Sequence, residues 1–105
     1  MMNDKELLEL AAKAAGYRLA NTKPGYPLYV ENGIGIWNPL TDDGDALRLA
    51  VGLKFGISIP VHKTICADVI CFLDSSVNVR EGGTDPYAAT RRAIVRAAAE
   101  IGKGE

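Results

Sequence analysis

The feature that most constrains this fold is an Asn32-Gly33 pair between two short apolar runs. The runs are Leu28-Tyr29-Val30 and Ile34-Gly35-Ile36-Trp37. Asn-Gly suits a tight turn in which both central residues have positive φ, and such a turn joins antiparallel strands. We therefore expect a β-hairpin here. Gly35, inside the second run, indicates a bulge or a close backbone approach.

Amphipathic helices are predicted near both ends of the chain. The first runs from Asn3 to Ala15, because Asn3 suits a helix start and Gly16 suits a helix end. The last runs from about Asp85 to Ile101, since Pro86 fits the first helical position, and Gly102 is expected to close it. Helical spacing predicts a buried side made of Tyr87, Thr90, Ile94, Ala97, Ala98 and Ile101.

A third helix is predicted in the middle of the chain. It starts near Asp42 or Asp43, after a proline, and Gly56 is expected to end it. Its wide apolar stripe indicates a well-buried helix. Gly52 interrupts the stripe, which indicates close packing at that point. The apolar positions are Ala46, Leu47, Leu49, Ala50, Val51, Leu53 and Phe55.

Short strands fill the remaining segments. The candidates are residues 17–22, 57–61, 65–73 and 77–80, together with the two hairpin strands. Helices and strands do not alternate strictly, which disfavours a doubly wound parallel sheet. We expect a single α+β domain over residues 1–105. Its largely antiparallel sheet of 4–6 short strands would be covered by three helices, as an α-β-α sandwich in the order α-β-β-(β)-α-β-β-(β)-α.

Composition excludes several classes of protein. The 105 residues are 48% apolar and 24% charged, which is ordinary for a globular domain. A net charge of -1 argues against a strong nucleic-acid binder. No apolar run approaches the ~18 residues of a membrane span. Two cysteines fit free thiols in a reducing compartment, so we expect a cytoplasmic protein without a membrane partner.

Two blocks carry a resemblance to a known family. They are WNPLTDDGDALRLA at residues 37–50 and DPYAATRRAIVRAAAEIG at residues 85–102. Together they resemble small phage and prophage proteins grouped as the phage α-β-α sandwich domain. The resemblance implies a sheet between helices and a phage or prophage origin, hence the cytoplasm of a bacterial host. It implies no activity, and it supplies no catalytic residues.

The acidic and thiol residues are best explained by structure. Asp42, Asp43 and Asp45 offer oxygen ligands for a cation, but acids at a helix start also cap it and complement its dipole. We interpret them as capping residues. His62, Cys66 and Cys71 provide too few ligands for structural zinc, and an apolar strand disfavours a reactive thiolate. We therefore expect no metal and no cofactor.

Aromatic and cationic residues give the candidate interaction surface, which consists of Tyr17, Tyr26, Tyr29, Arg92 and Arg96. Interfaces favour tyrosine and arginine. The sequence therefore predicts a non-enzymatic phage or prophage accessory protein that binds a host or phage protein, modulating a host factor or a defence system. Self-association through a sheet edge near Pro60 is a variant. The alternatives are an enzyme or ligand-binding domain around His62, Asp68 and Cys66, and nucleic-acid binding through the last helix.

Overall fold

The computed structural model describes residues 2–21, 27–31, 35–59, 67–71 and 76–104. The elements in these ranges are α1 (Asp4–Ala15), β1 (Leu19–Asn21), β2 (Tyr29–Val30), β3 (Gly35–Ile36), α2 (Asp43–Gly52), β4 (Phe55–Ser58), β5 (Ala67–Cys71), β6 (Asn78–Glu81) and α3 (Pro86–Lys103). Every strand pair is antiparallel. The expected α+β class, with three helices and this element order, is confirmed.

The described strands form two separate sheets of three, in the orders β1-β2-β3 and β4-β5-β6. In the first sheet Tyr29 pairs with Ile36, which confirms the predicted antiparallel strands. The Asn32-Gly33 turn lies outside the described residues. Gly35 has a φ of +81°, and a Cβ there would meet nothing within 4 Å. Glycine is therefore required by the backbone angle and not by a close approach.

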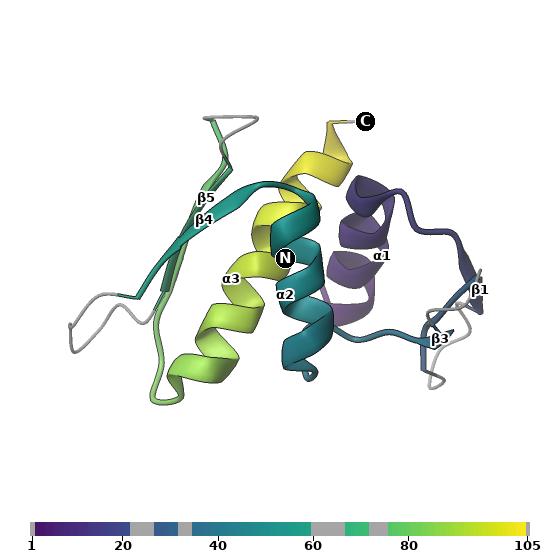
Figure 1. Ribbon diagram of the computed structural model, residues 1–105, viewed down its shortest axis with the longest axis horizontal. Coiled ribbons are helices and arrows are strands. Elements are labelled where there is room, and N and C mark those ends of the chain that lie inside the picture. Colours follow the sequence, from purple (N-terminus) through teal and green to yellow (C-terminus); the bar gives the residue numbers. More distant parts are fainter. Residues whose placement is uncertain (1, 22–26, 32–34, 60–66, 72–75, 105) are drawn as a thin grey trace.

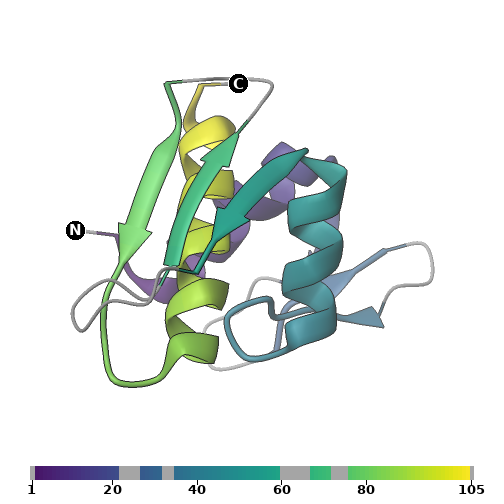
Figure 2. The same ribbon diagram turned by 60° about the vertical axis from the view of Figure 1, so that its left-hand side comes forward.

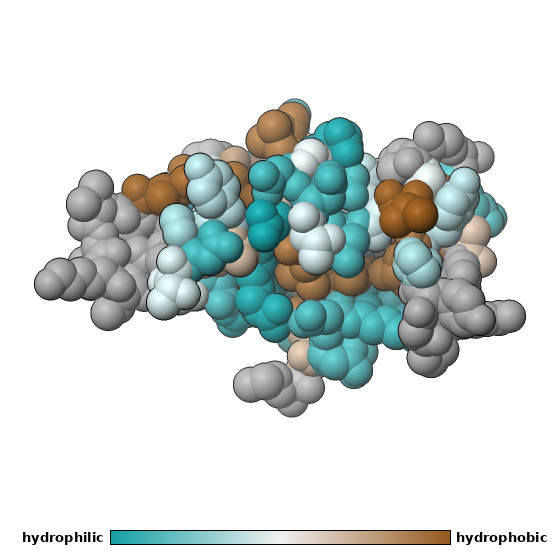
Figure 3. All heavy atoms as spheres, turned by 90° about the horizontal axis from the view of Figure 1, so that it is seen from below, coloured by the Kyte–Doolittle hydropathy of each residue, from teal (hydrophilic) through white to brown (hydrophobic). Residues whose placement is uncertain are grey.

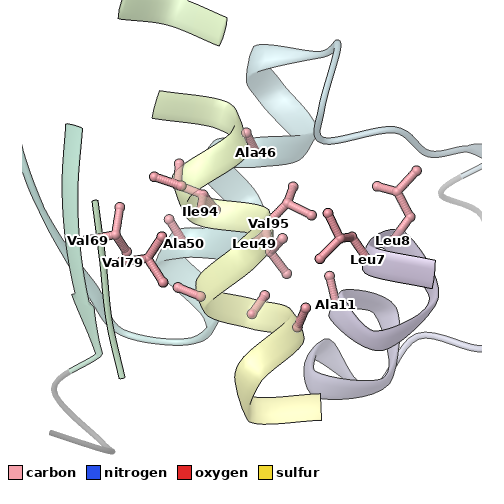
Figure 4. Close-up of a cluster of buried hydrophobic side chains, with 14 of the residues drawn as sticks. Leu7, Leu8, Ala11, Ala46, Leu49, Ala50, Val69, Val79, Ile94 and Val95 are labelled. Carbon is pink, nitrogen blue, oxygen red and sulfur yellow. The ribbon is translucent and has the colours of Figure 1, made fainter. Parts of the chain in front are cut away.

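Helix α3 lies at the centre of the fold. The β4-β5-β6 sheet covers one side of it, α1 lies on another side, and α2 lies alongside (Figures 1 and 2). Val69 and Val79 of the sheet and Leu7 of α1 point toward α3 from opposite sides (Figure 4). The layering thus differs from the expected sandwich, since a helix takes the middle position. The cause is that α3 is apolar or small on most of its circumference, with these residues buried: Ala89, Ala93, Ile94, Val95, Ala97, Ala98, Ala99 and Gly102.

The contact between α1 and α3 depends on small side chains. A Cβ built on Gly102 would overlap the carbonyl oxygen of Leu10 and would lie 2.8 Å from its carbonyl carbon. Gly102 therefore lies inside α3 as a packing residue. The prediction that it closes the helix is wrong, and α3 continues to Lys103 with Gly104 as its C-cap.

Of the three aspartates interpreted as capping residues, Asp42 is the N-cap of α2, as predicted. Asp42 caps α2 by accepting a hydrogen bond from the N–H of Asp45 at 2.8 Å. The buried Asp45 carboxylate accepts bonds from the N–H of Asn38 at 3.0 Å and from Arg48 at 2.7 Å. The bond from Arg48 to Asp45 raises the pKa of the Arg48 guanidinium above its usual value. These bonds hold the chain that enters α2 against its first turn.

Helix α2 ends earlier than the sequence predicts. Its last residue is Gly52, Leu53 is the C-cap, and the chain turns at Lys54, whose φ is +61°. Gly56 consequently belongs to β4, where it pairs with Ile70. The expectation of close packing at Gly52 is also wrong, because that glycine is exposed and a Cβ there would meet nothing within 4 Å.

Candidate functional site

An apolar groove lies where α2, the start of α3 and strand β4 meet. Its volume is about 470 Å³. Helix α2 supplies one wall, the first two turns of α3 supply the second, and β4 with the residue after it supplies the third. The lining residues are Asp43, Ala46, Leu47, Ile57, Ile59, Pro86, Tyr87, Thr90, Arg91 and Ile94.

Three large side chains of the groove are much more exposed than a folded core allows. Tyr87 is 71% exposed, Ile59 is 61% exposed and Leu47 is 60% exposed. The prediction that Tyr87 belongs to the buried side of α3 is wrong, because Tyr87 lies at the groove, where no described element covers it. Figure 3 shows hydrophobic residues exposed at separate places among hydrophilic ones on the face that it views. Exposed apolar side chains gathered around a hollow are typical of binding surfaces.

A single ion pair accounts for the charge in the lining. The Arg91 guanidinium lies 2.7 Å from a carboxylate oxygen of Asp43 and donates a second bond to the carbonyl of Leu40 at 2.8 Å. The side chain of Arg91 is only 19% exposed, so the pair ties the start of α3 to the start of α2. The groove is electrically neutral as a result, and it favours apolar, uncharged groups.

The groove carries little reactive chemistry. The Thr90 hydroxyl donates to the carbonyl of Pro86 at 2.6 Å, one turn earlier in α3. Among the described residues there is no group of three His, Cys, Asp or Glu side chains that could hold a metal ion. The groove lining as described contains no histidine or cysteine to act as base or nucleophile. The described lining therefore offers mainly apolar contacts to a ligand.

One pattern in the sequence indicates an uncovered apolar row at this groove. Leu47 and Val51 are four residues apart and form a second apolar row on α2, beside the row of Ala46 and Ala50. The Ala row is buried, whereas Leu47 and Val51 are both exposed. A helix packed against one neighbouring surface buries only part of its circumference. The apolar stripe of α2 is wider than that part, so one of its rows stays exposed.

The tyrosines of the predicted surface have different environments. Tyr17 is partly buried, and its ring packs edge-on against Trp37 with the ring centres 5.6 Å apart. Tyr29 is exposed on β2, across from the exposed Ile36 of β3. Tyr26 lies outside the described residues. Tyr29 and Ile36 thus form a second, smaller apolar pair on the first sheet.

The arginines of α3 are paired with carboxylates. Arg92 lies 3.2 Å from Asp4 of α1, and Arg96 contacts Glu81 of β6. Together with the Arg91 pair, these contacts neutralise three cations that an exposed nucleic-acid site would need free. Arg92 and Arg96 line a shared hollow together with Met2 and Leu7, at the start of α1.

The residues of the enzyme alternative are only partly described. His62 and Cys66 lie outside the described residues. Asp68 is on β5 with one carboxylate oxygen 3.6 Å from Arg80 and the other buried without a hydrogen-bond partner in the described structure. Cys71 is fully buried and its thiol donates to the carbonyl of Leu53 at 3.5 Å. Asp68 and Cys71 are three residues apart on one strand and therefore project to opposite faces of the sheet.

Comparison of the chain with protein-family models, with curated proteins and with solved structures finds no match. In the part of the chain that the structure describes, none of the helices is both long and apolar enough to cross a membrane.

Proposed function

We propose that this chain is a non-enzymatic binding protein that contacts another protein through the apolar groove. The observation that carries the proposal is the exposure of Leu47, Ile59 and Tyr87 around one neutral hollow of about 470 Å³. Monomeric proteins rarely leave such side chains together in water, and patches of this kind are often functional.

Burial of the exposed side chains around the groove would contribute free energy to a complex. Full burial of a Leu, Ile or aromatic side chain stabilises a complex by about 1.5–3 kcal/mol. Three side chains that are more than half exposed therefore offer about 3–6 kcal/mol between them, which is a substantial part of the ~8 kcal/mol of a micromolar complex. Tyrosine is also enriched among the residues that dominate interface energies.

A protein partner fits better than the two alternatives. Nucleic acid is disfavoured because Arg91, Arg92 and Arg96 are each engaged by a carboxylate. A small molecule held in the hollow would leave the outer surfaces of Tyr87 and Leu47 in water, whereas a macromolecular surface covers them. In keeping with the phage-family resemblance, the proposed setting is the cytoplasm of a bacterial host, and the proposed partner is a host or phage protein.

Site-specific photocrosslinking in bacterial host cells tests the proposal. A benzophenone amino acid replaces Tyr87 at the rim of the groove, and the crosslinked species are compared with and without Leu47→Lys. We expect a discrete protein adduct that Leu47→Lys removes, because the variant replaces an apolar wall of the groove with a charged side chain that the partner would have to strip of water.

A matched control comes from the other exposed apolar pair. Ile36→Lys makes the same kind of change at a side chain that is 65% exposed on β3, outside the groove. It should leave the adduct unchanged. An adduct that survives Leu47→Lys, or the complete lack of one with a folded protein, would refute groove-mediated protein binding.

A further inference from the structure

Strand β4 is an outer strand of its sheet, and its free edge borders the groove. In the described sheet β4 pairs only with β5, in the register Gly56 with Ile70 and Ser58 with Asp68. An edge of this kind carries backbone N–H and C=O groups that can pair with another extended chain.

The hydrogen bonds of β5 show which backbone N–H and C=O groups of β4 are unpaired in the described sheet. The N–H of Cys71 donates to the carbonyl of Val77 at 3.2 Å, toward the β6 side. Successive residues of an antiparallel strand direct their backbone N–H and C=O groups to opposite sides. Ile70 and Asp68 therefore direct these groups toward β4, where their partners in the register are Gly56 and Ser58.

Ile57 of β4 therefore directs its N–H and C=O to the free edge. Its side chain lies on the same face of the sheet as Val69, its buried partner in the register, and lines the groove. The residue whose backbone is open to pairing is thus also a wall of the apolar hollow.

The sheet is too narrow for the helices beneath it. Strands lie about 4.8 Å apart, while packed helices lie about 8–10 Å apart, so two strands are needed to cover one helix. Strands β5 and β6 pack on α3, and in the described sheet only the outer strand β4 lies against α2 (Figure 2). A fourth strand on the free edge of β4 would lie across the exposed Leu47 of α2, which lines the groove.

We infer that the partner of the groove is an extended segment of another protein that adds to β4 as a fourth strand. The inference rests on the proposed function, and it specifies the form of the ligand. Strand addition takes affinity from backbone hydrogen bonds and specificity from alternate side chains. Here the side chains that face the helices enter a neutral, apolar groove, so the segment carries uncharged apolar residues at every second position.

The charges and the extent of the groove favour such a segment over other occupants. Asp43 and Arg91 neutralise each other, so a charged side chain entering the groove would lose water without gaining a partner. A stable dimer of this chain needs roughly 20–30 residues on each side, far more than the exposed side chains around the groove supply. A second β4 placed symmetrically would also bring the α2 helices of both copies beneath the same strands, closer than the ~8–10 Å that packed helices require.

Selection from a displayed library of random twelve-residue peptides tests the inference, with the folded protein as bait. We expect the selected peptides to share apolar residues at alternate positions, which is the period of a strand. Binding of a selected synthetic peptide should weaken by about tenfold or more with Ile57→Pro relative to Ile57→Ala. Both variants shorten the side chain, but only proline removes the N–H, and that N–H is not part of the β4-β5 ladder.

Amide hydrogen exchange on the unmodified protein gives a second readout that does not depend on a proline variant folding. The N–H of Ile57 should become protected when the peptide binds, and that of Gly56, already paired with β5, should not change. Strand addition would be overturned by peptides with helical spacing of apolar residues or by the selection of no peptide. Equal binding to Ile57→Pro and Ile57→Ala, or an unprotected Ile57 N–H, would also overturn it. Peptides that tolerate Leu47→Lys as well would instead refute the proposed function, because they would not use the groove.

Discussion

Replacing Gly102 with alanine should separate the two helices that build the core. A Cβ at this position would overlap the carbonyl oxygen of Leu10 and lie 2.8 Å from its carbonyl carbon, and both atoms belong to rigid helical backbone. Carbon contacts need about 3.5–4.0 Å, so α1 and α3 must move apart by about 1 Å, which forfeits up to about half of each contact energy across the interface. Overpacking of this kind costs about 3 kcal/mol, and the better helix propensity of alanine returns about 1 kcal/mol. We expect a net loss of about 2 kcal/mol.

Urea unfolding, followed by far-UV circular dichroism and by the fluorescence of the buried Trp37, measures this loss. The midpoint should fall by about 1 M for a domain of this size. Gly52→Ala is the matched control, since it makes the same substitution in α2 where a Cβ meets nothing within 4 Å. It should raise stability by up to about 1 kcal/mol. A Gly102→Ala protein as stable as the unmodified one would refute the close approach of α1 and α3.

Two further substitutions test the ends of α2. Asp45→Ala removes the buried carboxylate that accepts hydrogen bonds from the Asn38 N–H and from Arg48. It should lower the free energy of unfolding by about 1–3 kcal/mol in the same urea assay. An unchanged midpoint would mean that these hydrogen bonds make no net contribution to stability. Lys54→Gly relieves a φ of +61° and should add up to about 1 kcal/mol to the free energy of unfolding, which raises the melting temperature. A lower melting temperature would contradict strain at this turn.

Helix boundaries were predictable wherever the sequence carries a local cap. Asn3 accepts a bond from the N–H of Glu6, and Asp85 accepts from Tyr87, so both helix starts could be assigned from residue type and spacing. The end of α2 was not predictable, because the chain turns at a lysine with positive φ, a conformation that residue type does not announce. Capping is a property of neighbouring residues, whereas no residue type near Lys54 indicates this turn.

The groove was harder to predict than the helices that border it. Helical spacing places Tyr87 on the same side of α3 as Ile94, yet Ile94 is buried under the sheet and Tyr87 lies beyond it. Whether a residue on an apolar stripe is covered depends on the reach of elements distant in the sequence. The interaction surface proposed from tyrosine and arginine alone therefore did not include Leu47, Ile59 or Tyr87.

Helix α3 is the last of the described elements along the chain, although α1, α2 and the β4-β5-β6 sheet pack against it. During synthesis α1, α2 and the strands of this sheet are made before the helix that joins them. The pair between Asp4 and Arg92, for example, joins residues 88 positions apart. The apolar faces of the earlier elements remain in water for the several seconds that translation needs to reach α3, at roughly 5–20 residues per second. We therefore expect the apolar faces of α1 and α2 to be open to chaperones until α3 emerges, and the core to assemble only after that.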